Sequence, residues 1–377
     1  MRQLRHALRA SVAAALAIAT AATLAACAGA EAAAPHASGG TTVLRYQGSV
    51  GQVGFPELAE DLGYFHKVRL DWIGDVTGGP ASIQATVTGQ TDFGGAFNGA
   101  IAKLASTGAK ITSVISYYGV DQKTQGGYYT LAGSPIHDAH DLIGKKVAVN
   151  TLGAQAEFVV REWLARGGLT PDEVNKVQLV VVPPVNAEQV LRAHQVDVAA
   201  LSGVLQDKAL ARGGLTKLFG EDTLFGDFSY GTLIFRDDFV AKHRDAVADF
   251  VQGVARAIRW TQITPADQVQ ARFRSIIEKR GRGENADLVQ YWKSSSIPAA
   301  GGVIQPREIS IWVDWLVRNG QLKEGQLDPT KLWTNTFNPY ANGTYPADAG
   351  PDGRPVASTP AATTAASGAA STPAATR

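Results

Sequence analysis

Cysteine is almost absent from this sequence, which holds one cysteine, Cys27, and one methionine in 377 residues. A single cysteine excludes a disulfide within one chain. The 35 basic and 34 acidic side chains give a formal net charge of +1. Nucleic-acid binding needs a clustered basic face, so this near-neutral balance argues against a nucleic-acid partner. After the first 27 residues no second long apolar stretch occurs.

Common catalytic motifs are also missing. The sequence has no His-Glu-x-x-His and no Gly-x-Ser-x-Gly, and the run Ile143-Gly-Lys-Lys lacks the upstream glycine and the following Ser or Thr of a phosphate loop. His137 and His140 lie three residues apart in an Asp-rich turn without other ligand types, which favours a solvated turn over a metal site. We therefore expect no enzyme, no metal and no cofactor.

The amino-terminal region has the pattern of an export signal. Three arginines within the first nine residues precede an alanine-rich apolar stretch over 11–26, which is shorter and less apolar than a comfortable spanning helix. Leu24-Ala-Ala-Cys27 matches the bacterial lipobox, in which the cysteine thiol receives the lipid. An ordinary signal with a cysteine nearby by chance is the alternative. We predict a signal peptide over 1–26, lipidation of Cys27 and a protein anchored to the membrane outside the cytoplasm.

Two low-complexity segments flank the central part of the chain. Residues 27–41 are rich in Ala, Gly and Ser and predict a flexible tether behind the lipid. Residues 346–377 are mostly Ala, Thr, Pro, Ser and Gly, which bury too little apolar surface to offset the entropy of ordering. We predict that this tail is disordered. About 300 residues remain between the two segments, enough for two lobes.

The central part alternates strand and helix patterns, which is typical of a parallel-sheet α/β protein. After Tyr230 the pattern changes to consecutive amphipathic helices without strands between them. We predict a discontinuous first lobe over 42–128 and 232–345, and a second lobe over 129–231. The chain would then cross twice between lobes, and a cleft would lie at the carboxyl ends of the strands.

Small polar residues follow most of the predicted strands. Helix N-termini carry free N–H groups and a positive dipole end, and Gly, Ala, Ser, Thr and Asn let a ligand approach them. A ring of such ends suits a small oxyanion such as a sulfonate, nitrate or carboxylate. The same residues are also ordinary turn and cap residues, so each could be purely structural. The segments are Gln47-Gly-Ser49, Gly78-Gly-Pro80, Phe97-Asn-Gly99, Asn150-Thr-Leu-Gly-Ala154 and Leu201-Ser-Gly203.

Four segments carry a resemblance to a known family. They are Phe55-Pro-Glu-Leu-Ala-Glu-Asp-Leu-Gly-Tyr-Phe, Gly89-Gln-Thr-Asp-Phe-Gly, Asp141-Leu-Ile-Gly-Lys-Lys-Val-Ala-Val-Asn-Thr-Leu-Gly and Glu188-Gln-Val-Leu-Arg-Ala-His-Gln-Val-Asp-Val-Ala. With the lipobox and the two βα lobes, they resemble the substrate-binding lipoproteins of bacterial ABC importers. The closer resemblance is to the branch that includes the nitrate-, sulfonate- and taurine-binding proteins and the NMT1/THI5-like proteins.

The resemblance implies a type II periplasmic-binding-protein fold, two βα lobes with a double crossover hinge. It implies a receptor, expected to be monomeric, that hands one small solute to a membrane permease and its ATPase. The ligand positions that it implies are Gln47, Ser49, Gly79, Asn98, Asn150, Thr151, Gly153 and Ala154, to which the strand-end pattern adds Ser202. An aliphatic, taurine-like sulfonate or a related small oxyanion is the expected solute.

Three other functions stay open from the sequence. Tyrosines near the predicted crossings, including Tyr117, Tyr128 and Tyr230, could line a cleft for a pyrimidine or an aromatic solute, or could pack the hinge. An enzyme on the same fold would need a nucleophile, base or metal set that the motifs do not supply. The cysteine-rich motif of the yeast pyrimidine synthases is absent. A surface adhesin or sensor could also use a two-lobed clamp.

Overall fold

The computed structural model describes residues 37–38, 40–76 and 78–356. Cys27, the predicted signal peptide and most of both low-complexity segments lie outside these residues, so their roles stay predictions. Within the described part of the chain, no helix combines the length and the apolar character that crossing a membrane requires.

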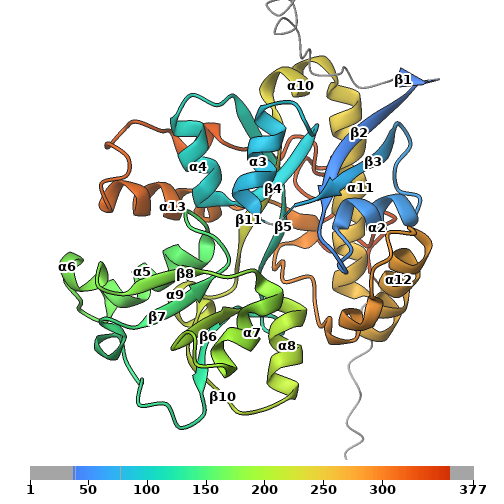
Figure 1. The fold of residues 1–377 in the computed structure, drawn as a ribbon. Coiled ribbons are helices and arrows are strands. Elements are labelled where there is room, and N and C mark those ends of the chain that lie inside the picture. Colours follow the sequence, from blue (N-terminus) through green and yellow to red (C-terminus); the bar gives the residue numbers. More distant parts are fainter. Residues whose placement is uncertain (1–36, 39, 77, 357–377) are drawn as a thin grey trace, which may run out of the picture.

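The strands form three sheets (Figure 1). The first has the order β1-β2-β3, the second β4-β11-β5 and the third β10-β6-β9-β7-β8. The strands are β1 (Ala37–Ser38), β2 (Thr41–Gly48), β3 (Val68–Asp75), β4 (Phe93–Phe97), β5 (Ile111–Val120), β6 (Gly127–Leu131), β7 (Lys146–Val149), β8 (Gln178–Val181), β9 (Val198–Leu201), β10 (Leu215–Gly220) and β11 (Phe228–Arg236).

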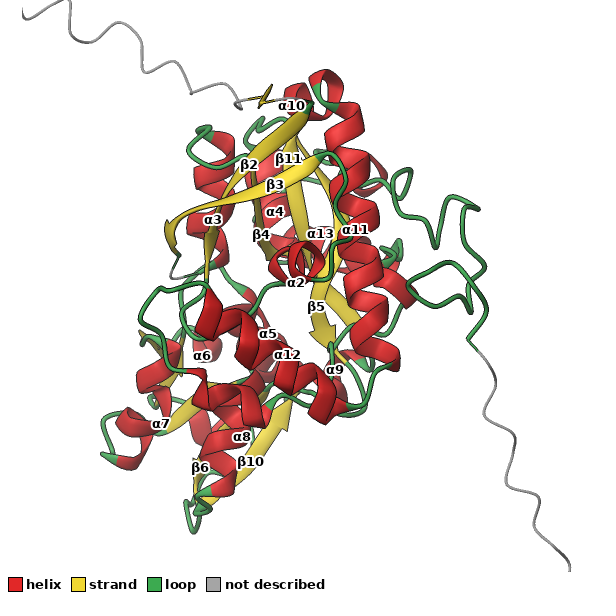
Figure 2. Ribbon diagram, turned by 90° about the vertical axis from the view of Figure 1, so that its right-hand side faces the viewer, coloured by secondary structure: helices red, strands yellow, loops and turns green. Residues whose placement is uncertain are grey.

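Helices cover these sheets and follow most of the strands (Figures 1 and 2). The α-helices are α2 (Phe55–Asp61), α3 (Gly79–Val87), α4 (Asn98–Ser106), α5 (Gln155–Arg166), α6 (Pro171–Val174), α7 (Pro184–Arg192), α8 (Gly203–Ala211), α9 (Glu221–Phe225), α10 (Asp237–Lys242), α11 (Arg244–Ile263), α12 (Ala266–Lys279) and α13 (Arg307–Arg318). Short 3₁₀ segments are η1 (His140–Leu142), η2 (Ala286–Tyr291), η3 (Ala300–Gly302) and η4 (Pro329–Lys331).

The α/β class is as predicted, but the sheets are not purely parallel. Strand β11 lies between β4 and β5 and is antiparallel to both. In the third sheet β7 is parallel to β8 and β9, whereas β6 and β10 are antiparallel additions at one side. The helix-strand alternation correctly indicated most elements, but it contained no signal for β6, β10 or α9.

Two connections join the second and third sheets. The chain leaves β5 after Val120 and enters β6 at Gly127, and it returns from α9 through residues 226–227 into β11. These connections lie a few residues before the crossings that the sequence suggested near 128–130 and 230–232. The proposed lobe boundaries at 128/129 and 231/232 remain predictions.

The start of the predicted disordered tail is ordered, which corrects one sequence expectation. Residues 346–356 pack on α11: Arg256 Nε donates to the carbonyl of Pro351 at 2.7 Å, and Arg259 Nε donates to that of Ala349 at 2.8 Å. Ala349 is fully buried. Composition did not show this order because the acceptors are backbone carbonyls, which every sequence carries. At the other end, Ala37–Ser38 of the predicted tether pairs with β2.

One aromatic cluster crosses between the parts of the molecule that hold the second and third sheets. Phe158 on α5 lies 4.2 Å from the ring of Trp315 and 5.0 Å from that of Phe97, measured between centroids. The ring of Trp312 lies 4.6 Å from Phe97. All four side chains are buried, so α5 is packed against α13 and the end of β4. Close-packed aromatic rings hold such a contact in one geometry.

Replacing Phe158 by alanine should therefore lower the free energy of unfolding by about 3–5 kcal/mol, because it removes a fully buried ring and leaves a cavity. Urea unfolding monitored by circular dichroism measures this change. Val185→Ala is the matched control: its side chain is 70% exposed, and a change within about 0.5 kcal/mol is expected. Equal effects of the two substitutions would contradict the role of this cluster.

Candidate functional site

A cavity of ≈ 90 Å³ lies at the carboxyl edge of the third sheet. Strands β7, β8 and β9 run parallel and end at this edge, where helices α5, α7 and α8 begin. The lining residues are Gly127, Tyr128, Val149, Asn150, Gln155, Ala156, Val182, Pro184, Ala187, Ala200, Leu201, Ser202, Leu205 and Glu221. The sequence had placed the cleft at the carboxyl ends of strands, and this cavity has that position.

Open helix N-termini contribute much of the cavity wall. The N-cap residues of α5, α7 and α8 are Ala154, Pro183 and Ser202, and none of them makes a side-chain capping hydrogen bond. Each helix has at least nine residues, and its first-turn N–H groups carry the positive end of the helix dipole. This arrangement suits a ligand with negative charge.

Asn150 and Ser202 are two of the predicted ligand residues, and the structure brings them together in this cavity. Asn150 Oδ1 is buried and has no hydrogen-bond partner. The Ser202 side chain is exposed and is free to donate toward a ligand. Buried polar atoms in proteins are nearly always paired, so the unpaired Asn150 oxygen is a notable feature of the cavity.

Glu221 is the acidic residue of the cavity, and no lysine, arginine or histidine is among the described residues that line it. Its side chain is 3% exposed. Gln155 Nε2 donates to Oε1, and the Tyr230 hydroxyl is nearby, but Oε2 has no hydrogen-bond partner. Burial raises the pKa of this carboxyl to about 7, against the lowering effect of the neighbouring donors.

Three further predicted residues, Thr151, Gly153 and Ala154, form the loop that leads from this cavity into α5. The N–H of Gly153 donates to Glu157 Oε2 at 2.8 Å, so that group is occupied within the protein. Gly153 has a φ of +70°, a conformation that favours glycine. A Cβ added at Gly78 would lie 3.7 Å from Thr151 Cγ2, so the N-terminus of α3 meets this loop.

The other four predicted residues lie in the part of the molecule that holds the first two sheets and do not line the cavity. Gln47 is near the end of β2, and Ser49 follows it and is exposed. A Cβ added at Gly79 would lie 2.9 Å from the Cα of Ala96, so Gly79 permits close packing of α3 on β4. Asn98 is 1% exposed.

Both ends of the Asn98 amide are used within the protein. Its Nδ2 donates to the carbonyl of Glu308 at 2.8 Å, and its Oδ1 accepts from the Thr232 hydroxyl at 2.9 Å. Glu308 in turn accepts from the Ser229 N–H and from the Ser116 hydroxyl, which lie on the neighbouring strands β11 and β5. Asn98 therefore has a structural role in the described molecule.

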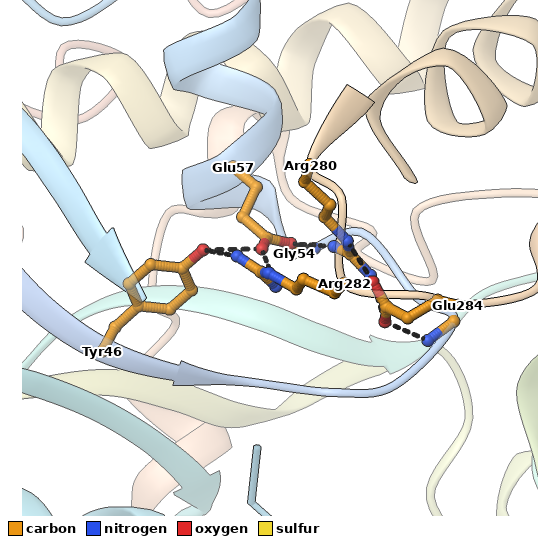
Figure 3. A network of polar contacts seen from close by, with 7 residues as sticks. Tyr46, Gly54, Glu57, Arg280, Arg282 and Glu284 are labelled. Atoms are coloured by element: carbon orange, nitrogen blue, oxygen red, sulfur yellow. Dashed lines mark hydrogen bonds and ion pairs between the residues drawn. The ribbon is translucent and has the colours of Figure 1, made fainter. Parts of the chain in front are cut away.

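A buried ionic network holds the loop that follows β2 (Figure 3). Glu57 accepts from Arg280, from Arg282 and from the Tyr46 hydroxyl, at distances between 2.6 and 3.0 Å. Glu284 pairs with Arg280 and also accepts from the Gly51 N–H at 2.6 Å. All the charged partners are nearly buried, so the network fixes the segment from Gly48 to Gly54 that follows the predicted residue Gln47.

The tyrosines near the connections pack between elements, and Tyr128 also lines the cavity. Tyr128 and Tyr230 are 1% and 6% exposed, and the Tyr128 hydroxyl donates to the carbonyl of Ala156 at 2.8 Å. Tyr118 packs edge-on against Tyr230 with ring centroids 4.9 Å apart. These residues pack between elements, and Tyr128 also lines the cavity, so both roles that the sequence suggested stay open.

Sequence reasoning missed Gln155 and Glu221. Gln155 is the residue directly after the predicted segment Asn150–Ala154, so a one-residue extension of that motif would have found it. Glu221 begins α9, which had no sequence signal, and it reaches the cavity only through the folding of β10 beside β6. Among the described residues, no group of three or more His, Cys, Asp or Glu side chains is placed to hold a metal.

A family model described as NMT1/THI5 like matches residues 57–268 of this chain. That match covers more than half of the sequence. The chain belongs to the NMT1/THI5-like family. Within the matched region, the buried Asp92 directly before β4 accepts from Arg45 Nη2 on β2 at 2.8 Å, and this contact joins the two strands.

Relatives named "Putative binding protein" in Brucella abortus and Brucella suis are 27% identical over 219 residues. The match covers 56% of this chain and 64% of the length of those relatives, which is less than two thirds.

The fold agrees with solved structures of periplasmic binding proteins, as predicted. The aliphatic sulphonate binding protein SsuA from Escherichia coli has a TM-score of 0.58 and 18% identity, over 78% of this chain and 92% of that one. The nitrate-binding protein NrtA from Synechocystis PCC 6803 has a TM-score of 0.63 and 13% identity, over 82% and 92%. The desulfurization enzyme DSZB also has this fold, with a TM-score of 0.55 and 15% identity, over 78% and 97%. The fold alone therefore does not decide between binding and catalysis.

The raised pKa of Glu221 makes stability depend on pH in a specific direction. In the unfolded chain a glutamate titrates near 4.5, whereas in the folded protein Glu221 titrates near 7. Its contribution to stability is complete below pH 4.5 and is lost as the pH rises through about 7. The Glu221→Gln variant does not lose stability in this way, because its side-chain amide does not ionise. Its stability relative to the unsubstituted protein should rise by about 3 kcal/mol between pH 4.5 and pH 8, as measured by urea unfolding.

Glu173→Gln is the control, because the Glu173 carboxylate is exposed and accepts hydrogen bonds from Thr170, which lower its pKa. The stability that Glu173 contributes is already complete above pH 4.5, so this variant should show a constant difference from pH 5 to pH 8. A constant difference for Glu221→Gln over the same range would contradict the buried, raised-pKa carboxyl.

Proposed function

We propose that this chain is the extracytoplasmic solute-binding component of an ABC importer and that it captures a small sulfonate or related oxyanion. The observation that carries the proposal is the cavity at the ends of β7, β8 and β9, where three helices begin without side-chain caps. Membership of the NMT1/THI5-like family and the fold of periplasmic binding proteins support it.

The chemistry of the cavity suits an anion held without a formal cation. First-turn N–H groups of α5 and α8 are donors, and the Ser202 hydroxyl adds another beside them. Such donors bind oxyanions through hydrogen bonds and the helix dipole. The N-terminus of α3 meets the α5 loop through Gly78 and Thr151, so a bound anion could be approached from both sides of the cleft.

Lipidation of Cys27 belongs to the same proposal. Bacterial lipoproteins carry more than one acyl chain, and two or more chains give stable anchoring at a membrane surface. An anchored receptor would stay close to the permease and ATPase that receive its solute. The proposed body lies between the tether and residue 356 and works as a monomer with one cleft.

A heterocyclic solute is the second candidate, and Glu221 is the observation that favours it. The unpaired acceptors Glu221 Oε2 and Asn150 Oδ1 would accept hydrogen bonds from the amino group of an aminopyrimidine. The cavity is too small for larger members of this class. With about 10–15 Å³ for each water-sized position, ≈ 90 Å³ holds roughly six to nine heavy atoms.

Thermal shift across a solute panel separates the two candidates. At millimolar concentration, small alkanesulfonates should raise the melting temperature by a few degrees, because a ligand that binds only the folded state stabilises it. Nitrate and acetate serve as smaller anions, and pyrimidine and 4-aminopyrimidine represent the heterocycles. Stabilisation by the heterocycles with no response to sulfonates would reject the sulfonate proposal.

Asn150→Ala tests whether the cavity is the binding site. The Asn150 amide can donate through Nδ2 to a sulfonate oxygen, so its loss should weaken the affinity for the best sulfonate about tenfold, as measured by isothermal titration calorimetry. Asn175→Ala is the matched control, since Asn175 is exposed after α6 and away from the cavity. Unchanged affinity for Asn150→Ala would place the ligand elsewhere in the cleft.

A further inference from the structure

Glu221 is an acid in a cavity whose other features suit a negative ligand. The N-termini of α5 and α8 provide donors in the wall, and no lysine, arginine or histidine is among the described lining residues. An ionised Glu221 and a bound anion would therefore be two like charges without a cation between them, in a place with little water to screen them. An anion binds best in this cavity when Glu221 carries no charge.

The contacts of Glu221 suit the protonated form of its carboxyl group. The residue is 3% exposed, and Oε1 accepts from Gln155 Nε2, whereas Oε2 is buried without a hydrogen-bond partner. In the ionised form the charge on Oε2 would meet no donor, and an unmet buried acceptor costs free energy. A proton on Oε2 changes this oxygen from an unpaired acceptor into an O–H donor on the cavity wall.

We infer that the receptor binds its anion together with one proton, which Glu221 holds and donates from Oε2 to an oxygen of the ligand. The inference rests on the proposed function and adds to it a ligand-contacting residue that the sequence did not indicate. The proton comes from the solvent and returns to it when the anion leaves, so no other reactant is needed. Because anion and proton enter together, the net charge of the cavity does not change.

The uncharged neighbours of Glu221 do not compete for this proton. Tyr118 on β5, Tyr128 on β6 and Tyr230 on β11 face the carboxyl, and burial raises the pKa of each tyrosine above its ordinary value. These hydroxyls therefore stay protonated up to pH 8.5. Gln155, which reaches Glu221 from α5, does not titrate.

The charged side chains on the surrounding elements form ion pairs. Asp222 is the charged neighbour of Glu221 on the same helix, and Lys217 on β10 lies 2.9 Å from it. Carboxylates, ammonium and guanidinium groups in such pairs keep their charges between pH 6 and pH 8.5. A proton taken up with the ligand in this range therefore belongs to Glu221. The other pairs are Asp207 with Lys293 on the side of α8, and Glu157 with Arg161 on α5.

The affinity for ethanesulfonate as a function of pH tests the inference, because a sulfonate stays ionised throughout and any change belongs to the protein. Isothermal titration calorimetry should show the Kd rising about tenfold or more from pH 6 to pH 8.5, mostly above about pH 7, where Glu221 loses its proton. At pH 7, titrations in buffers of different ionisation enthalpy should show uptake of roughly half a proton for each anion bound.

Glu221→Gln separates a direct role from a structural one. The amide has the shape of the carboxyl, does not ionise and can donate to the ligand through Nε2. Its Kd should stay within about threefold from pH 6 to pH 8.5, without proton uptake, and at pH 8.5 it should bind ethanesulfonate about fivefold or more tighter than the unsubstituted protein. Asp172→Asn is the matched control, since it removes an exposed carboxylate on α6 and should keep the original pH dependence.

Three results would count against the inference. A Kd that is constant over this range, or an affinity that rises with pH, would overturn the role of the proton and leave the anion receptor intact. The same pH dependence in Glu221→Gln and in the unsubstituted protein would assign the titration to another group. Failure of ethanesulfonate, acetate and nitrate to bind the unsubstituted protein at pH 6 would reject the proposed function and the inference with it.

Discussion

The packing of Phe158 against Trp315 and Phe97 fixes the position of α5, whose first turn forms part of the cavity wall. Phe158 lies one turn inside α5, and the first turn of that helix lines the cavity through Gln155 and Ala156. Because α13 and β4 hold this ring, the donors of α5 keep a fixed position relative to the second sheet. A preorganised wall lowers the cost of ordering groups when the ligand binds.

Most of the helix-strand order could be predicted from the sequence, because it depends on local periodicity. Strand β11 shows the limit, since its sequence predicts a strand but not that it enters antiparallel between β4 and β5. Strands β6 and β10 form at one side of the third sheet through pairing over more than 80 residues, which leaves no local pattern. The short helix α9 depends on that pairing, and Glu221 was missed with it.

The sequence also predicted part of the candidate site, but not the hydrogen-bond partners of its residues. Asn150 and Ser202 were found because strand ends in a parallel arrangement meet at one edge, and the structure brings both into one cavity. Asn98 follows a strand end in the same way, yet Glu308 and Thr232 use both ends of its amide. Sequence position shows that a polar residue lies at an edge, but its hydrogen-bond partners come from segments more than 100 residues away.

The packing of residues 346–356 on α11 makes this segment part of the folded body. Cutting before Pro346 would leave Arg256 and Arg259 without the carbonyls of Pro351 and Ala349, and would uncover the surface on which Ala349 is buried. Related genes should therefore keep the length of this segment, because insertions or deletions within 346–356 would be selected against.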